Sequence, residues 1–156
     1  MRVKRNLKIQ AIECGTVIDH IKAGQALNVL RILGISSDFR ATISFVMNAS
    51  GARGKKDVVK IEDKNLSIEE LNRITLISPK ATINIIRDFK VVQKNNVVLP
   101  SYVEGIVRCT NPNCISNSNE PIKSKFFVLQ EDEERVALQC LYCEHVISEN
   151  IAENLL

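Results

Sequence analysis

Four cysteines in the last third of the 156-residue chain constrain its fold more than any other feature. They form two close pairs, Cys109 with Cys114 and Cys140 with Cys143, and 25 residues separate the pairs. Two tight turns that each carry a thiolate pair are typical of a closed tetrahedral zinc site, which needs no further ligand. Two disulfides are the alternative interpretation, which a secreted chain would favour. The spacing therefore predicts one structural Zn²⁺ per chain.

The composition favours an intracellular chain with reduced thiols. The hydrophobic fraction is 45% and the charged fraction 25%, as in ordinary globular proteins. No apolar run approaches the roughly 18 residues that cross a membrane, and the basic residues 1–6 precede no long apolar stretch of the signal-peptide type. We therefore expect a cytoplasmic protein without a membrane partner. Cys14 is then a spare thiol, best interpreted as a small, partly buried hydrophobe.

The charge is distributed unevenly along the chain. Residues 1–100 carry 17 Lys and Arg against 9 Asp and Glu, a net charge of +8, whereas residues 101–156 carry 4 against 9, a net charge of −5. A basic front part indicates an anionic ligand or partner. The chain is therefore expected to divide near Pro100 into a ligand-binding domain, residues 1–100, and a zinc domain, residues 101–156.

Hydrophobic periodicity predicts an α+β fold. In the first domain, alternation indicates strands and a period near 3.6 indicates helices, one of them carrying Leu27, Leu30 and Leu33 at a spacing of three. The order strand, helix, strand, strand, helix, strand is that of a ferredoxin-like βαββαβ domain. A small antiparallel β zinc domain follows it. The expected strands are residues 7–12, 16–20, 41–48, 57–62, 81–86, 89–94, 97–99, 125–130, 136–140 and 146–147, and the expected helices are 23–33 and 68–77.

The sequence contains no convincing catalytic constellation, since nucleophile-elbow, zinc-protease and dinucleotide motifs are all missing. Asp19 and His20 are adjacent, but neighbouring strand residues point to opposite faces, so we do not expect a direct dyad. Lys60 interrupts an apolar strand. Its ammonium group must either reach water or meet an anion.

Several short stretches together are typical of one known family. They are residues 15–21 (Gly-Thr-Val-Ile-Asp-His-Ile), 50–51, 54–57, 60–62, 79–84 and 99–100, together with Ile12, Asn113-Cys114-Ile115-Ser116 and Cys140-x-Tyr142-Cys143-Glu144. On these residues the chain resembles, over essentially its full length, the regulatory chain of aspartate carbamoyltransferase.

The resemblance implies a non-catalytic subunit that regulates pyrimidine biosynthesis. In that family an N-terminal ferredoxin-like allosteric domain binds nucleotide effectors such as CTP and ATP, and it also pairs with a second regulatory chain. The C-terminal zinc domain docks on the catalytic chain, so that two catalytic trimers assemble with three regulatory dimers.

The resemblance also implies a nucleotide site. Lys60 is expected near base and sugar, and Lys94 and His20 near the phosphates. Phe89 stands where some members of the family have Tyr. The complete set of nucleotide-binding residues implied by position is Ile9, Ala11, Ile12, Val17, Asp19, His20, Val58, Lys60, Asn84, Ile86, Val91 and Lys94.

A basic α/β domain with a zinc ribbon also occurs in nucleic-acid-binding proteins, which is the alternative hypothesis. The net charge of −5 in residues 101–156 and the shortage of aromatic residues disfavour it, because phosphate contacts and base stacking require Lys, Arg and aromatic side chains. We therefore expect no nucleic-acid partner. An enzyme is a distant third hypothesis.

Overall fold

A computed structural model describes residues 11–156, which divide into two compact units. The first unit contains residues 11–67 and 81–96, and the second contains residues 68–80 and 97–156. Ile9 and most of the expected strand 7–12 lie outside the described residues. Ala11 and Ile12 are described and belong to no strand, and the expected strand at residues 97–99 is wrong, because β5 ends at Asn96. No helix within residues 11–156 combines the length and the apolar character needed to cross a membrane.

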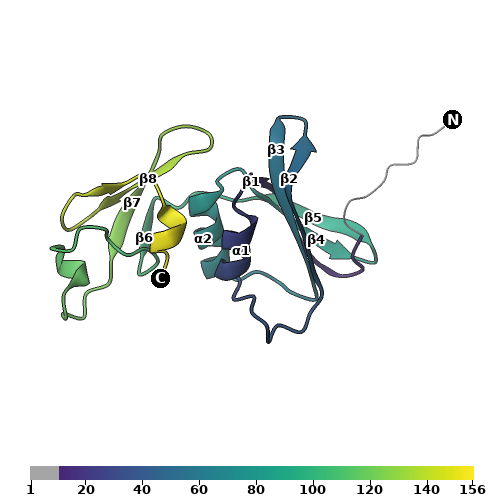
Figure 1. Cartoon of the computed structure of the whole chain (residues 1–156), viewed down its shortest axis with the longest axis horizontal. Helices are drawn as coiled ribbons and strands as arrows, with labels where there is room; N and C mark the ends of the chain where they lie inside the picture. The colour runs from purple at the N-terminus through teal and green to yellow at the C-terminus, as the bar shows by residue number, and fades with distance from the viewer. Residues whose placement is uncertain (1–10) are drawn as a thin grey trace. The chain divides into compact units, whose positions relative to one another are not determined.

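The first unit is built on a five-stranded sheet in the order β2-β3-β1-β4-β5, in which every neighbouring pair is antiparallel (Figure 1). One helix, α1, follows β1, and a second, α2, follows β3. This is the ferredoxin-like order with an additional edge strand, and it confirms the predicted fold class. The bounds within this unit are β1 Gly15–Lys22, α1 Ala26–Ile32, β2 Ile43–Gly51, β3 Gly54–Glu62, β4 Thr82–Arg87 and β5 Lys90–Asn96, whereas α2, Ile68–Ile77, belongs to the second unit.

One face of this sheet packs against α1. Alternate residues of the central strands, among them Ile18, Val59 and Ile61, are completely buried, and α1 contacts β2 and β3. The helix is shorter than expected, and it buries Ala26 and Val29. The predicted leucine face is therefore wrong at Leu27, which is 57% exposed.

A buried carboxylate connects α1 to the sheet. Oδ2 of Asp57, on β3, accepts hydrogen bonds from the backbone amides of Gly24 and Ala26, each at 2.9 Å. Its Oδ1 accepts one from the amide of Asn48 at 2.8 Å. Asp57 is completely buried, and it satisfies amides at the start of α1 that no helical carbonyl reaches.

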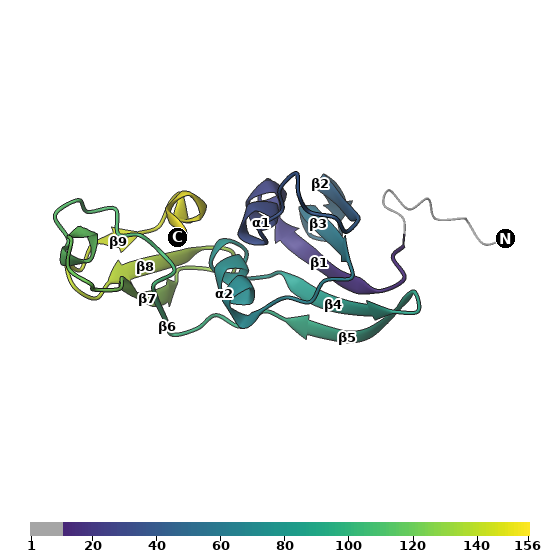
Figure 2. The same cartoon turned by 90° about the horizontal axis from the view of Figure 1, so that it is seen from below.

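The second unit contains a four-stranded antiparallel sheet in the order β6-β7-β8-β9 (Figure 2). Phe126 on β7 and Leu138 on β8 are buried, and the short apolar runs at residues 125–130 and 136–140 located these strands correctly. The turn between these strands is closed by Oδ1 of Asp132, which accepts from the amides of Glu134 and Arg135. The bounds are β6 Tyr102–Glu104, η1 Ile115–Asn117, β7 Lys125–Gln130, β8 Val136–Cys140, β9 Val146–Ile147 and η2 Ile151–Asn154.

Candidate metal centre and ligand-binding sheet face

The first cysteine pair lies on a turn that its own polar side chains hold closed. The amide of Cys114 donates to the carbonyl of Asn111 at 3.1 Å. Nδ2 of Asn117 donates to the carbonyls of Cys109 at 2.9 Å and of Asn111 at 2.7 Å. Both thiols of the pair are buried, Cys109 to 2% and Cys114 to 3% exposure. The turn therefore directs two sulfur atoms inward.

The second pair lies where β8 ends in a tight turn. The amide of Cys140 donates to the carbonyl of His145 at 2.9 Å, and the amide of Glu144 donates to the carbonyl of Cys140 at 3.0 Å. Glu144 has a φ of 64°, a left-handed conformation that favours glycine. This turn places Cys143 back beside Cys140.

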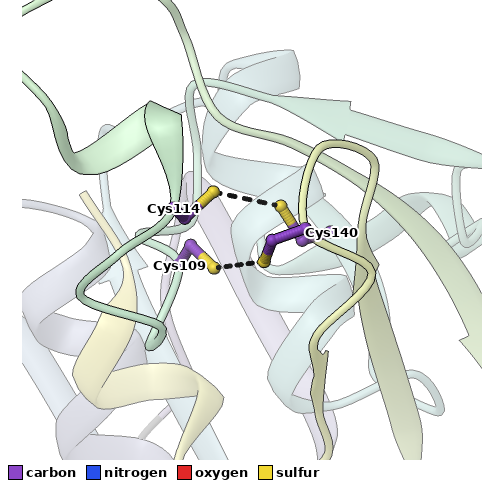
Figure 3. A group of neighbouring side chains, drawn as sticks. Cys109, Cys114 and Cys140 are labelled. Carbon is purple, nitrogen blue, oxygen red and sulfur yellow. Dashed lines mark hydrogen bonds between the residues drawn. The ribbon is translucent and has the colours of Figure 1, made fainter.

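The two turns bring all four sulfur atoms within 4.8 Å of one another. The Sγ of Cys109 lies 3.6 Å from that of Cys143, and the Sγ of Cys114 lies 3.7 Å from that of Cys140 (Figure 3). A disulfide would need about 2.05 Å, and all four thiols are free, so the disulfide alternative is wrong. A tetrahedron with Zn–S bonds of about 2.3 Å has edges of about 3.8 Å. The donor set therefore fits one metal ion.

The electrostatics of the cluster call for a cation. Burial raises the pKa of the Cys109 thiol to about 12 and also raises the pKa of Cys140. The pKa of Cys143 is lowered to about 7, chiefly by the backbone N–H of His145. The Oγ of Ser116 lies 3.1 Å from the sulfur of Cys114. Buried thiolates are stable only next to compensating positive charge, which a bound metal ion supplies.

The second candidate site is the sheet face opposite α1. The register pairs Val17 with Lys60 on β3 and with Asn84 on β4, and it pairs Asn84 with Lys94 on β5. These residues form one row across four strands, and residues in register side by side point to the same face. Burial lowers the pKa of Lys60, whose ammonium group stands within an otherwise apolar strand. The row therefore presents two cations and one amide on a half-buried surface.

A bulge in β1 brings Asp19 and His20 to the same side of the sheet. The register shifts between Ile18 and Ile21, and His20 has a φ of 57°. Nδ1 of His20 lies 3.9 Å from Oδ2 of Asp19 and 3.1 Å from Oγ1 of Thr82. The expectation that Asp19 and His20 point to opposite faces is thus wrong, because a bulge interrupts strand alternation.

Asp19 also forms an ion pair with Lys56, which was not among the predicted site residues. Nζ of Lys56 lies 2.9 Å from Oδ1 of Asp19. Burial alone would raise the pKa of Asp19, but Lys56 and the backbone amide of His20 outweigh it and lower the pKa below its usual value. Lys56 and Lys60 are an even number of residues apart on β3, so both side chains point to the same face of the sheet. The sequence contained that signal, but it could not place Lys56 beside Asp19, because Asp19 lies on another strand.

The remaining residues of the predicted nucleotide site lie around this row. Ile86 pairs with Val91 and also with Gly15, the first residue of β1. Ile86 and Ile12 are buried, Val58 is half-buried, and Ala11 and Val91 are exposed. Ile9 lies outside the described residues.

The comparisons with known proteins agree along the chain. The family model described as aspartate carbamoyltransferase regulatory chain, allosteric domain, matches residues 7–98. The chain belongs to the aspartate carbamoyltransferase regulatory chain family. A second model of that family, the metal binding domain, matches residues 101–153, which include all four cysteines.

Curated regulatory chains of aspartate carbamoyltransferase are similar over their whole length. The protein from Methanosarcina barkeri is 86% identical over 100% of both chains, and that from Methanosarcina mazei is 83% identical over 100% of both. The one from Methanothrix thermoacetophila is 56% identical over 99% of both. The expectation of a regulatory rather than catalytic chain, with an allosteric and a metal-binding domain, is confirmed.

Proposed function

We propose that this regulatory chain binds CTP, ATP or a related nucleotide on the open face of its five-stranded sheet, and thereby controls the catalytic chains of aspartate carbamoyltransferase in pyrimidine biosynthesis. The holoenzyme contains two catalytic trimers and three regulatory homodimers in the cytoplasm. The proposed domains are residues 1–100, which bind the effector, and residues 101–156, which bind Zn²⁺ and dock on the catalytic chain.

One observation carries the nucleotide proposal, namely the row in which Lys60, Val17, Asn84 and Lys94 stand side by side on four strands. Asn84 offers an amide to a base edge or a sugar hydroxyl, and Val17 offers apolar surface. Lys60 is assigned to contacts with the base and the sugar, and Lys94 and His20 are assigned to contacts with the phosphates. The lowered pKa of Lys60 supports this assignment, because a ligand oxygen offsets the cost of burying its charge.

The four-cysteine cluster supports a structural role for Zn²⁺. Cys109, Cys114, Cys140 and Cys143 leave no ligand position open for substrate, as is typical of structural zinc. A module of this size buries little apolar surface on folding, so metal binding is needed to stabilise it. Zinc thiolates also suit a reducing compartment, which supports the cytoplasmic assignment.

Regulation requires that the effector bind one state of the holoenzyme more tightly than another. A coupling free energy of about 1–3 kcal/mol between effector and catalytic sites is usual for such systems. Reciprocity then requires catalytic-site ligands to change the effector affinity by the same factor. This reciprocal shift distinguishes regulation from mere nucleotide binding.

The test is thermal unfolding of the zinc-loaded chain with CTP, ATP and UTP. At 100 times the dissociation constant, a ligand that binds only the folded state stabilises it by about 2.7 kcal/mol. We expect Lys60→Ala to abolish this stabilisation. Arg40→Ala is the matched control, because it removes an exposed cation from a loop of the same unit.

The outcomes separate the two halves of the proposal. Stabilisation by CTP that persists in Lys60→Ala but disappears in Arg40→Ala would refute the assigned face. An absence of stabilisation by every nucleotide, with zinc loading verified, would refute nucleotide binding by the chain and leave its role in assembly intact. Reconstitution with catalytic trimers then tests that role by the mass of the complex.

A further inference from the structure

An open pocket of about 950 Å³ lies in the second unit, and none of the four cysteines of the metal cluster lines it. The first turns of α2, strand β6 with the segment that follows it, and residues 116–124 form its walls. Three cations line it, Arg73, Arg108 and Lys123, together with two carboxylates, Glu69 and Glu104, and we name it the cation pocket. Nothing in the proposed zinc or nucleotide binding uses these residues.

The cations of the pocket outnumber its carboxylates by three to two, and Glu104 already faces Lys125 at 4.0 Å. Within residues 11–156, neither Arg108 nor Lys123 has an ion-pair partner. Arg73 has only a long pair, 4.0 Å to a Glu69 whose side chain is 82% exposed. Residues 101–156 carry a net charge of −5, so cations gathered in one hollow run against the composition of the module.

The local packing holds the cations at the pocket wall. The stem of Lys123 passes over Gly105, where an added Cβ would lie 3.7 Å from Cδ of the lysine. Ser124 and Ser118, also in the wall, donate their hydroxyls to the carbonyls of Val107 and Ile115. These two hydroxyls are therefore engaged by the protein, so an anion would meet the three cations, with Glu69 and Glu104 as the opposing charges of the wall.

We infer that the cation pocket binds a small polyanion through phosphate or carboxylate groups. The guanidinium groups of Arg73 and Arg108 offer paired N–H donors that match the oxygens of a phosphate or of a carboxylate, and the ammonium group of Lys123 adds a point charge. Tyr102 and Ile122 in the same wall supply surface for an apolar part of the ligand. The wall also includes Ser116 and Asn117, which follow Cys114 in the chain. A ligand bound in the pocket would therefore lie next to the turn that carries the first cysteine pair.

The test is a titration of the zinc-loaded full chain by amide NMR, with Lys60→Ala and Lys94→Ala together as background, because Lys94 is assigned to the phosphates on the proposed nucleotide face. The probes are inorganic pyrophosphate and, separately, tricarballylate, which distinguish a phosphate from a carboxylate ligand. We expect saturable shifts of the Gly105, Ser118 and Ser124 amides with at least one probe. Arg108→Gln with Lys123→Gln is expected to weaken binding at least about tenfold, because charge-assisted hydrogen bonds are lost.

The control variant is Arg135→Gln, which removes an exposed cation from the β7–β8 turn of the same unit. Unchanged affinity in this variant supports the cation pocket. If Arg135→Gln and the double variant weaken probe binding equally, the effect comes from the net charge of the chain and not from the pocket, and the inference is overturned. An absence of saturable shifts with both probes, while zinc content and unfolding temperature match the wild type, would overturn it too. Because the reporting amides, those of Gly105, Ser118 and Ser124, lie in the second unit, neither result bears on the nucleotide face.

Discussion

The ammonium nitrogen of Lys56 lies 2.9 Å from Oδ1 of Asp19, and this ion pair joins β3 to the bulged end of β1. It lies on the sheet face proposed to bind nucleotide. The carboxylate also accepts the backbone amide of His20 at 2.6 Å. Asp19 thus fixes the bulge that turns His20 toward the same side.

The pair predicts a pH-dependent contribution to stability. The folded-state pKa of Asp19 lies below the ordinary value of 3.8. Its contribution is therefore fully present above about pH 4 and is lost as pH falls through the lower, folded-state pKa. We expect Asp19→Asn to lower the free energy of unfolding by about 1 kcal/mol near neutral pH, with little difference from wild type near pH 2. Urea unfolding at several pH values measures this. A difference that is the same at every pH would contradict it, and Asp38→Asn, in an exposed loop, is the control.

Lys94 and Lys90 provide a matched pair on β5. Lys94 pairs with Asn84 in the proposed binding row, whereas Lys90 pairs with Arg87 at the hairpin end. Both side chains are exposed, so neither substitution is expected to affect folding. We expect Lys94→Ala to weaken CTP binding about tenfold and Lys90→Ala to leave it nearly unchanged, as measured by calorimetric titration. Equal losses would mean that the two lysines act only through the net charge.

Asp57 is expected to be among the most sensitive positions of the first unit. Asp57→Ala leaves the amides of Gly24, Ala26 and Asn48 without their acceptor in a buried place. We expect a loss of about 3 kcal/mol in the free energy of unfolding, measured with denaturant. The exposed Glu13, changed to Ala, should cost less than about 0.5 kcal/mol. A small effect at Asp57 would show that water replaces the carboxylate.

Glu144 is expected to tolerate substitution by glycine. Its φ of 64° strains an L-residue, and that strain is relieved in Glu144→Gly. We expect a gain of about 0.5–1 kcal/mol in the stability of the zinc-loaded chain. Glu149→Gly is the matched control, because Glu149 has no positive φ and should lose stability instead. Loss of stability in both variants would contradict the role assigned to the turn.

Removal of the metal is expected to unfold the second unit selectively. Structural zinc supplies about 10–16 kcal/mol of apparent binding free energy in peptide models. Because the pKa values of Cys109 and Cys140 are raised, metal binding near neutral pH must displace protons, and zinc affinity should rise with pH. Hydrogen exchange after chelation should show lost protection in β7 and β8 and retained protection in β1 and β3. Retained protection in all four strands would argue against a structural metal.

Local patterns in the sequence predicted much of the fold. The bounds of β7 and β8 follow from short apolar runs, and the metal cluster follows from cysteine spacing, because each turn places its own pair. Leu27 was misplaced because a leucine repeat at a spacing of three does not distinguish which side of a short helix meets the sheet. The bulge at His20 was missed because it depends on the two strands that flank β1.

The sequence by itself determined the strand and helix order, the two cysteine turns and the basic character of the front part, since these depend on residues close together in the chain. The tertiary structure decided the row that joins Lys60, Val17, Asn84 and Lys94, the pairing of Lys56 with Asp19, and the cation pocket. The physical reason is register: a shift of one residue between two strands moves every side chain to the opposite face, and only the packing of the whole sheet selects one register.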